Sequence, residues 1–350
     1  MKNLAVHVVA ALVMAIPVLV SSGCSKNSGD DDSDLVGNWI RSEDFRGDPR
    51  SEAVSFVLNN KAYVGTGLFA TTAQYSNLFY AFDLDQGFWE QIELFPGEMR
   101  RGAVAFAVAG KAYVATGFNG PDNKLLKDVW QYDPSGPVGQ KWKPMKEFPG
   151  VARRNAVAFT IGNKAYIATG YSTSALSDLW EYNPADDSWT EKASLRGRKR
   201  SQSVAFVVGD KAYICSGNNN GEALNDLQVY DPTTNKWTEK RKISNATDET
   251  FDDEYAAIAR YSAVAFVMNN NKVYLACGRA GSLIGETWEY DPATDLWDKK
   301  TGFEGAGREG AIAFTLQQRG FVLTGRSGSE PFDNMFEFRP NDEQNDNDNN

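Results

Sequence analysis

Hydrophobic and polar residues alternate in short runs along most of the chain, which predicts β-strands. One such run, Ala103–Val108, is followed after a two-residue gap by Lys111–Thr116, a spacing typical of a β-hairpin. Two more runs follow, Asp128–Tyr132 and a stretch that begins at Trp142. No segment with the period of an amphipathic helix interrupts them. The pattern therefore predicts a unit of four antiparallel strands.

This unit occurs six times. Each copy opens with an arginine, continues through a V-A-F-like triplet and Lys-Ala-Tyr or a relative, and closes its second strand with Thr-Gly or a similar pair. A four-stranded sheet cannot bury both faces alone, so repeats of about 50 residues predict stacked blades of an all-β propeller. We name the six opening arginines the rim arginines: Arg50, Arg100, Arg153, Arg200, Arg260 and Arg308.

A tryptophan marks the fourth strand of each of the first five units, and the sixth unit has none. Trp39 stands before the first unit, 11 residues ahead of Arg50, and the same distance separates Trp89 from Arg100. We therefore expect the segment around Trp39 to supply the missing strand of the last blade. Such a strand closes the ring and removes an open sheet edge. The prediction is a monomeric propeller of six four-stranded antiparallel blades over residues 36–339.

The repeats resemble Kelch motifs, and the whole resembles the Kelch-type, galactose-oxidase-like β-propeller. One departure is that Kelch repeats usually carry Gly-Gly where this chain has Thr-Gly, Ser-Gly or Cys-Gly. Kelch propellers include enzymes, glycan-binding proteins and protein-docking modules, so the resemblance implies the fold more strongly than the function.

The two ends of the chain predict an anchored protein. Residues 1–23 resemble a bacterial lipoprotein signal peptide, with Lys2, the apolar run Leu4–Val20 and then Ser-Ser-Gly before Cys24, the expected lipidation site. An uncleaved membrane anchor is the alternative. Residues 24–35 predict a flexible acidic tether of the type found in surface lipoproteins of the Bacteroides group. Residues 340–350 predict a disordered acidic tail. We expect an outer-membrane lipoprotein at the cell surface, with a periplasmic orientation as the alternative.

The amino-acid composition argues against several kinds of catalytic and metal site. The single histidine is His7, inside the predicted leader, so a Ser-His-Asp triad is impossible after cleavage and histidine-bound copper or zinc is not expected. The copper chemistry of galactose oxidases therefore does not carry over. We predict no metal and no cofactor. Cys215 and Cys277 are expected to be buried free thiols. The chain has 46 acidic and 36 basic residues, which argues against nucleic acid as a partner.

Antiparallel strand order places the links from strand two to strand three on one face of the ring, where they vary in length and sequence. We call this the variable-loop face and expect the ligand there. The rim arginines are interpreted as structural, since every blade repeats them, with an anion trap as the alternative. Residues that break the symmetry are the candidate ligand contacts: Arg279, Arg326, Arg101, Arg154, Tyr171, Phe118, Glu52 and Glu309. The insertion at 240–259 is either a flap over the central funnel, where the innermost strands of the blades meet, or a surface loop.

These observations favour a surface-anchored module that binds a glycan or a partner protein, and no catalytic residue is assigned. The alternative is a carbohydrate-active enzyme that works without histidine. The resemblance offers a precedent in the Kelch-type sialic acid mutarotase (N-acetylneuraminate epimerase), although no motif specific to that family is matched. We therefore expect binding in preference to catalysis.

Overall fold

The computed structural model describes Met1 and residues 35–69, 74–268 and 271–349. Residues 1–34 and 35–350 separate into two units, and the strands all belong to the second. Apart from Met1 and residue 35, the predicted signal peptide and the predicted tether lie outside the described residues. Within the described part of the chain, no helix is long and apolar enough to cross a bilayer.

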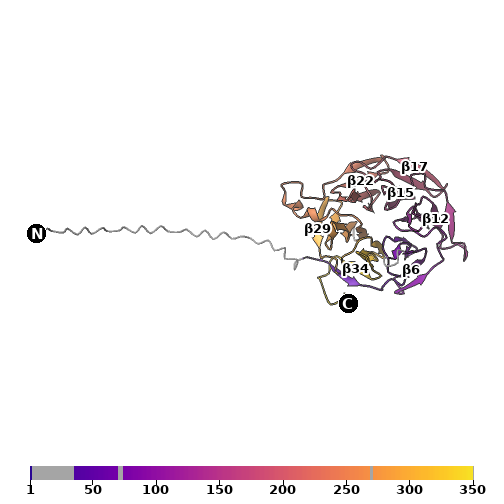
Figure 1. The fold of residues 1–350 in the computed structure, drawn as a ribbon, viewed down its shortest axis with the longest axis horizontal. Helices are drawn as coiled ribbons and strands as arrows, with labels where there is room; N and C mark the ends of the chain where they lie inside the picture. Colours follow the sequence, from indigo (N-terminus) through magenta and orange to yellow (C-terminus); the bar gives the residue numbers. More distant parts are fainter. Residues whose placement is uncertain (2–34, 70–73, 269–270, 350) are drawn as a thin grey trace. The chain divides into compact units, whose positions relative to one another are not determined.

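Six four-stranded antiparallel sheets stand around a central axis as the blades of a propeller, confirming the predicted fold (Figure 1). Blade 1 contains β2 (Val54–Leu58), β3 (Lys61–Gly65), β6 (Phe79–Asp83) and β7 (Phe88–Gln91). Blade 2 contains β8 (Val104–Val108), β9 (Lys111–Ala115), β12 (Val129–Tyr132) and β13 (Trp142–Met145). Blade 3 contains β14 (Val157–Ile161), β15 (Lys164–Ala168), β16 (Leu179–Asn183) and β17 (Ser188–Lys192).

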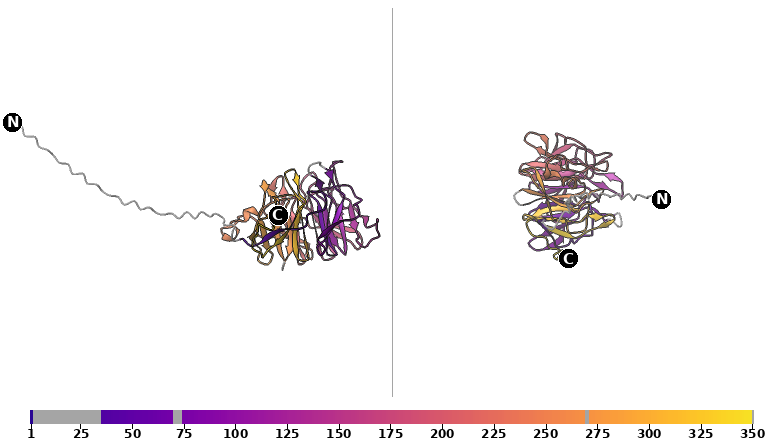
Figure 2. Two further views of the ribbon diagram at one scale, coloured as in Figure 1. Left: turned by 90° about the horizontal axis from the view of Figure 1, so that it is seen from below. Right: turned by 90° about the vertical axis from the view of Figure 1, so that its left-hand side faces the viewer.

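The remaining blades follow the same order. Blade 4 contains β18 (Val204–Val208), β19 (Lys211–Cys215), β22 (Leu227–Asp231) and β23 (Lys236–Glu239). Blade 5 contains β24 (Val264–Met268), β25 (Lys272–Ala276), β28 (Thr287–Asp291) and β29 (Leu296–Lys300). Blade 6 contains β30 (Ile312–Leu316), β31 (Arg319–Leu323), β34 (Met335–Arg339) and β1 (Asn38–Arg41). The side view in Figure 2 shows the strands running across the thickness of the ring.

The repeated sequence phrase corresponds to cross-strand pairs in each blade. In blade 1, Phe56 of the innermost strand lies directly opposite Tyr63 of the next, and their rings stack with centroids 4.9 Å apart. Blade 2 repeats the arrangement with Phe106 and Tyr113 at 5.1 Å. Aromatic pairs of this kind stabilise neighbouring strands. The Phe and Tyr positions recur along the chain because every blade needs this contact.

Hydrophobic packing joins the blades into a closed ring. The buried side chains form six clusters, and each cluster combines residues of two neighbouring blades. Trp39 belongs to the cluster between blades 5 and 6, where it is fully buried. Its ring centroid lies 4.9 Å from that of Phe303 and 4.7 Å from that of Phe338, and its Nε1 donates to Thr287 Oγ1. β1 pairs with β34, so the predicted closure by the N-terminal strand is confirmed.

The rim arginines are buried inside the blades that they open, with exposed fractions of 1% or less. Each Nε donates to the carbonyl two residues earlier, as Arg153 does to Val151 O at 2.9 Å. Each Nη1 donates to the carbonyl that follows strand two, as Arg153 does to Thr169 O at 2.8 Å. In blades 1, 2, 3 and 6 a phenylalanine ring also covers the guanidinium carbon, at 4.8 Å for Arg153 and Phe148. This arrangement favours the structural interpretation.

The six guanidinium groups differ in their charge partners. In blades 2, 3 and 4 each binds one aspartate through two hydrogen bonds of 2.6–2.7 Å, with Asp128, Asp178 and Asp226 as the acceptors. In blades 5, 6 and 1 the described residues include no such aspartate. Burial accordingly lowers the pKa of Arg50, Arg260 and Arg308 to about 10 in each case.

The ends of the described chain meet beside blade 6. Gly37 N donates to Asp342 O, Asn345 N donates to Asn38 Oδ1, and Arg41 N donates to Asp348 O. These contacts place residues 342–348 along β1, an arrangement that the predicted disordered tail did not include. The covering segment leaves less of the β1 edge open to other strands.

Replacing the closing indole tests the importance of β1. Trp39→Ala should lower the free energy of unfolding by about 3–5 kcal/mol, because a fully buried aromatic side chain is lost and a cavity remains. Chemical denaturation of the variant and the parent protein measures this difference. Phe88→Ala is a suitable control, since Phe88 is 45% exposed. Equal losses in the two variants would contradict the view that Trp39 secures the ring.

The ion pair between Arg153 and Asp178 makes the stability of the protein depend on pH. Burial acts to raise the pKa of Asp178, but Arg153 outweighs it, so the pKa lies below its usual value. The contribution of Asp178 is thus complete above the unfolded-state pKa of about 4 and is lost as pH falls through the lower folded-state value. At pH 7, Asp178→Asn should cost roughly 2–4 kcal/mol, since it leaves a buried guanidinium without its carboxylate. Unfolding curves from pH 7 to pH 3 should show this difference shrink below about pH 4. Exposed Asp253→Asn should change little, and a pH-independent loss would contradict the ion-pair explanation.

Candidate functional site

The links between the second and third strands form small hairpins on the variable-loop face. They are β4–β5 (Leu68–Phe69 and Gln74–Tyr75), β10–β11 (Phe118–Asn119 and Lys124–Leu125), β20–β21 (Asn218–Asn219 and Glu222–Ala223), β26–β27 (Arg279–Ala280 and Ser282–Leu283) and β32–β33 (Arg326–Ser327 and Glu330–Pro331). In blade 3 a bridge between Tyr171 and Ala175 takes the same place. Each link begins beside the residue that follows a rim arginine: Arg101 bridges Phe118, Arg154 bridges Tyr171, and Glu309 bridges Arg326. In these blades, the residue after the rim arginine therefore lies beside the first residue of the link. Both positions differ from blade to blade.

A closed ring of backbone hydrogen bonds lies around the central axis at the second residue after each rim arginine. Six N–H groups each donate to the carbonyl of the equivalent residue in a neighbouring blade, over 2.7–3.0 Å. All six residues have φ between 54° and 62°. We call them the ring residues: Glu52, Gly102, Asn155, Gln202, Ser262 and Gly310. A cavity of about 120 Å³ is lined by these residues and their neighbours.

Charged side chains connect blades 5, 6, 1 and 2 at the funnel. Arg279 Nη1 lies 3.3 Å from Glu309 Oε1, which lies 3.6 Å from Nε of Arg326. Arg326 Nη2 lies 3.6 Å from Glu52 Oε1, which accepts a hydrogen bond of 2.6 Å from Arg101 Nη1. Both glutamate side chains are nearly buried, with exposed fractions of 11–12%. We call these five side chains the funnel ion network.

Aromatic rings continue this network into blades 2 and 3. The guanidinium carbon of Arg101 lies 5.6 Å from the centroid of Phe118, and that of Arg154 lies 5.0 Å from the same ring. Arg154 also lies 5.7 Å from the ring of Tyr171. Contacts of this length are attractive through the ring quadrupole. The structure therefore brings all eight sequence-derived candidate contacts into one connected set.

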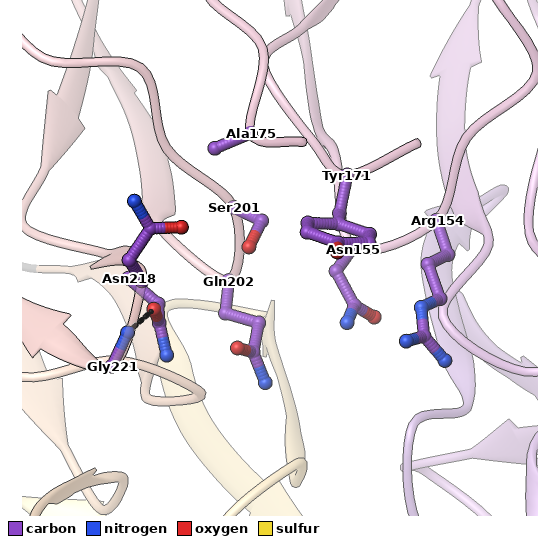
Figure 3. A pocket seen from close by; sticks show the side chains of 9 residues that line it. Arg154, Asn155, Tyr171, Ala175, Ser201, Gln202, Asn218 and Gly221 are labelled. Atoms are coloured by element: carbon purple, nitrogen blue, oxygen red, sulfur yellow. Dashed lines mark hydrogen bonds between the residues drawn. The ribbon is translucent and has the colours of Figure 1, made fainter. Parts of the chain in front are cut away.

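Blades 3 and 4 add a pocket that the sequence analysis missed, and its lining is uncharged apart from Arg154. A cavity of about 270 Å³ is lined by Arg154, Tyr171 and a set of uncharged polar residues (Figure 3). Figure 3 shows the amides of Asn155 and Gln202 pointing the same way as the Arg154 guanidinium. The missed lining residues are Asn155, Ser201, Gln202, Asn218 and Asn220. The sequence contained a signal for two of them, Asn155 and Gln202. Both stand two residues after a rim arginine, at a position that varies between blades while the repeated phrase around it stays similar.

The insertion at 240–259 lies at the outer edge of the ring, beside β29 in Figure 1. It contains two short 3-10 helices, η2 (Thr250–Asp252) and η3 (Tyr255–Ala257). Buried Tyr255 holds it in place, because its hydroxyl donates to Trp297 O and accepts from Trp297 N, over 3.1 and 2.7 Å. Trp297 belongs to β29, the outermost strand of blade 5. This packing supports the surface-loop interpretation and not the flap.

The described residues offer little for metal or thiol chemistry. No group of three or more histidine, cysteine or acidic side chains among them could hold a metal ion. Cys215 and Cys277 are free and buried, as predicted. Burial raises the pKa of the Cys215 thiol to about 12 and that of Cys277 to about 11. Thiols in such surroundings are poor nucleophiles.

Comparison with known proteins supports the repeat assignment. Residues 39–198 match the KLHDC2/KLHL20/DRC7 Kelch-repeats domain, and residues 199–242 match the Kelch motif. A solved structure titled "Structure of YjhT" superposes with a TM-score of 0.69, covering 84% of this chain and 95% of that one, at 16% identity. At that identity the likeness shows the fold alone.

One curated relative matches over a short stretch. N-acetylneuraminate epimerase of Pasteurella multocida (strain Pm70) is 36% identical over 58 residues. The match covers 15% of this chain and 15% of the epimerase. Both Kelch matches fall within the six blades described above, and the ring closes through β1. The chain accordingly contains Kelch-repeat domains and has a six-bladed β-propeller fold.

Proposed function

We propose that this protein is a binding module whose ligand, a glycan or a partner protein, docks on the variable-loop face. The convergence of the eight candidate residues carries the proposal. They come from blades 5, 6, 1, 2 and 3, and ion pairs and ring contacts join them into one surface. Charged and aromatic residues that break the repeat, gathered on the loop face of a rigid scaffold, are typical of a binding site.

The mixture of side chains favours a glycan with an acidic group. Phe118 and Tyr171 supply aromatic surfaces, the amides of Asn155 and Gln202 can bond hydroxyl groups, and the guanidinium groups can bind a carboxylate. The eight candidate residues include four arginines and two glutamates, which gives them a net charge of +2. The cavity of about 270 Å³ suits a ligand of roughly monosaccharide size.

A second candidate is a carbohydrate-active enzyme that changes the configuration of an acidic sugar. The short match to N-acetylneuraminate epimerase favours it, as does the presence of two carboxylates in the funnel. Proton transfer at a sugar ring needs an acid and a base, which carboxylates can provide without histidine. Proton NMR of freshly dissolved N-acetylneuraminate, with and without the protein, distinguishes the two functions. Faster approach to anomeric equilibrium supports the enzyme, and binding without acceleration supports the module.

We place the protein on the outer membrane, anchored through a lipid on Cys24, with its binding face at the cell surface and a periplasmic orientation as the alternative. The motivation is the leader-like sequence of residues 1–23 and the polar, acidic stretch that follows it. We expect a monomer and no nucleic-acid partner.

Removing two arginines of the funnel ion network tests the proposed face. Arg279→Ala combined with Arg326→Ala should weaken an acidic glycan, because the net charge of the eight residues falls from +2 to zero and Glu309 loses both of its partners. We expect a loss of about 1–3 kcal/mol in binding free energy, measured by calorimetry on a ligand found by glycan array. Arg46→Ala, at the outer edge of blade 1, is the control. Unchanged affinity in the double variant would show that the acidic group of the ligand binds away from these two arginines.

The predicted anchor has a direct test. Cys24→Ser should move the protein from the membrane fraction to the soluble fraction or leave an unprocessed precursor, because the lipid acceptor is gone. Fractionation and mass measurement of the expressed protein distinguish these outcomes. The uncleaved anchor would be supported if the variant stays entirely in the membrane fraction and if both the variant and the parent protein have the mass of the uncleaved precursor.

A further inference from the structure

We propose that Arg154 is the subsite that binds the anionic group of the ligand, a small molecule that carries one carboxylate together with hydroxyl or amide groups. The proposal rests on the binding function assigned to the variable-loop face. It assigns the carboxylate of the ligand to a residue outside the funnel ion network. The sequence alone had favoured Arg279 and Arg326, because these two arginines break the six-fold repeat.

Charge compensation separates Arg154 from the other funnel arginines. Arg101, Arg279 and Arg326 share the two carboxylates of Glu52 and Glu309. A ligand carboxylate that bound one of them would compete with a nearly buried glutamate. Arg154 forms no ion pair and donates no guanidinium hydrogen bond to any residue in the described ranges. An incoming carboxylate there displaces no protein partner, only solvent.

The guanidinium of Arg154 is nevertheless held in place. Phe118 and Tyr171 lie 5.0 and 5.7 Å from its central carbon, and the backbone of Arg154 bridges that of Tyr171. Contacts with two rings restrain the side chain without using its N–H donors. A guanidinium whose donors remain free can form the paired hydrogen bonds that a carboxylate accepts. Less conformational entropy is lost on binding when the group is already restrained.

The cavity beside Arg154 supplies neutral partners for the rest of the ligand. Gln202 Nε2 donates to Ser262 Oγ at 2.7 Å, which leaves its carbonyl oxygen for a ligand donor. Asn218 Oδ1 accepts from Gly221 N at 2.8 Å, which leaves its amide N–H groups for a ligand acceptor. Among the described residues, no acidic side chain lines this cavity to repel an anion. The geometry thus favours a hydroxylated acid over its uncharged counterpart.

Matched sugars test this assignment on the full chain. Calorimetric titration would use D-glucuronate, D-galacturonate and N-acetylneuraminate, with D-glucose, D-galactose and N-acetylmannosamine as uncharged counterparts. We expect at least one acid to bind about tenfold or more tightly than its counterpart. Arg154→Gln should bring that ratio close to one, while Arg154→Lys should retain part of it because the charge remains. Arg46→Gln is the control, and each variant's melting temperature verifies folding.

The outcomes separate this inference from the function on which it rests. If the parent protein binds none of the acids more tightly than the counterparts, or if Arg154→Gln keeps the preference, the assignment of Arg154 is overturned. A glycan that binds the variable-loop face with no preference for acids would leave the proposed function intact and remove only this subsite. Added salt should weaken the acid's binding to the parent protein but hardly affect its binding to Arg154→Gln, since screening acts on the charge that Arg154 supplies.

Discussion

The buried guanidinium of each rim arginine determines where the loops of the variable-loop face begin. In blade 3, Arg153 joins three segments through the carbonyl of Val151, the carbonyl of Thr169 and the carboxylate of Asp178. These segments lead into the first strand, leave the second and enter the third. A single side chain therefore fixes the link between strands two and three at both ends. The next residue, Arg154, points into the funnel from this fixed base, which is why a structural arginine and a candidate ligand contact can be neighbours in sequence.

Charge is distributed unevenly around this frame. Blades 2, 3 and 4 neutralise their rim arginines with aspartates, whereas the described residues of blades 5, 6 and 1 provide no such partner. The funnel shows a different asymmetry, since its glutamates lie in blades 1 and 6, whereas the pocket lined by Arg154 and uncharged side chains lies between blades 3 and 4. A symmetric scaffold thus presents a polarised surface, with paired charges on one side and Arg154, amides and hydroxyl groups on the other. Such a surface suits a ligand whose charge sits at one end.

The sequence predicted the fold well because the features that define it are repeated. Six copies of the aromatic pair, five of Phe with Tyr and one of Phe314 with Phe321, were enough to predict the blade count, and the unpartnered Trp39 predicted the closing strand. The eight candidate contacts were found as exceptions to the repeat, and they do converge. Asn155 and Gln202 were not predicted as site residues, because an amide at a variable position is typical of an ordinary loop. Only their neighbours across the ring identify them as pocket residues. The ion pairs of Glu52 with Arg101 and Arg326 depend on side chains 49 or more positions apart, which spacing alone does not predict.

The strand that closes the ring also determines the order in which the protein can be completed. β1 pairs with β34, so Asn38–Arg41 must wait for Met335–Arg339, about 300 residues later. At a synthesis rate of about 5–20 residues per second, that interval lasts about 15–60 s. During this time Trp39 has no blade to join, and the edge that it will cover does not yet exist. The last blade is thus the slowest to form, and a chaperone or the export machinery has its longest opportunity to act on the segment next to the predicted leader.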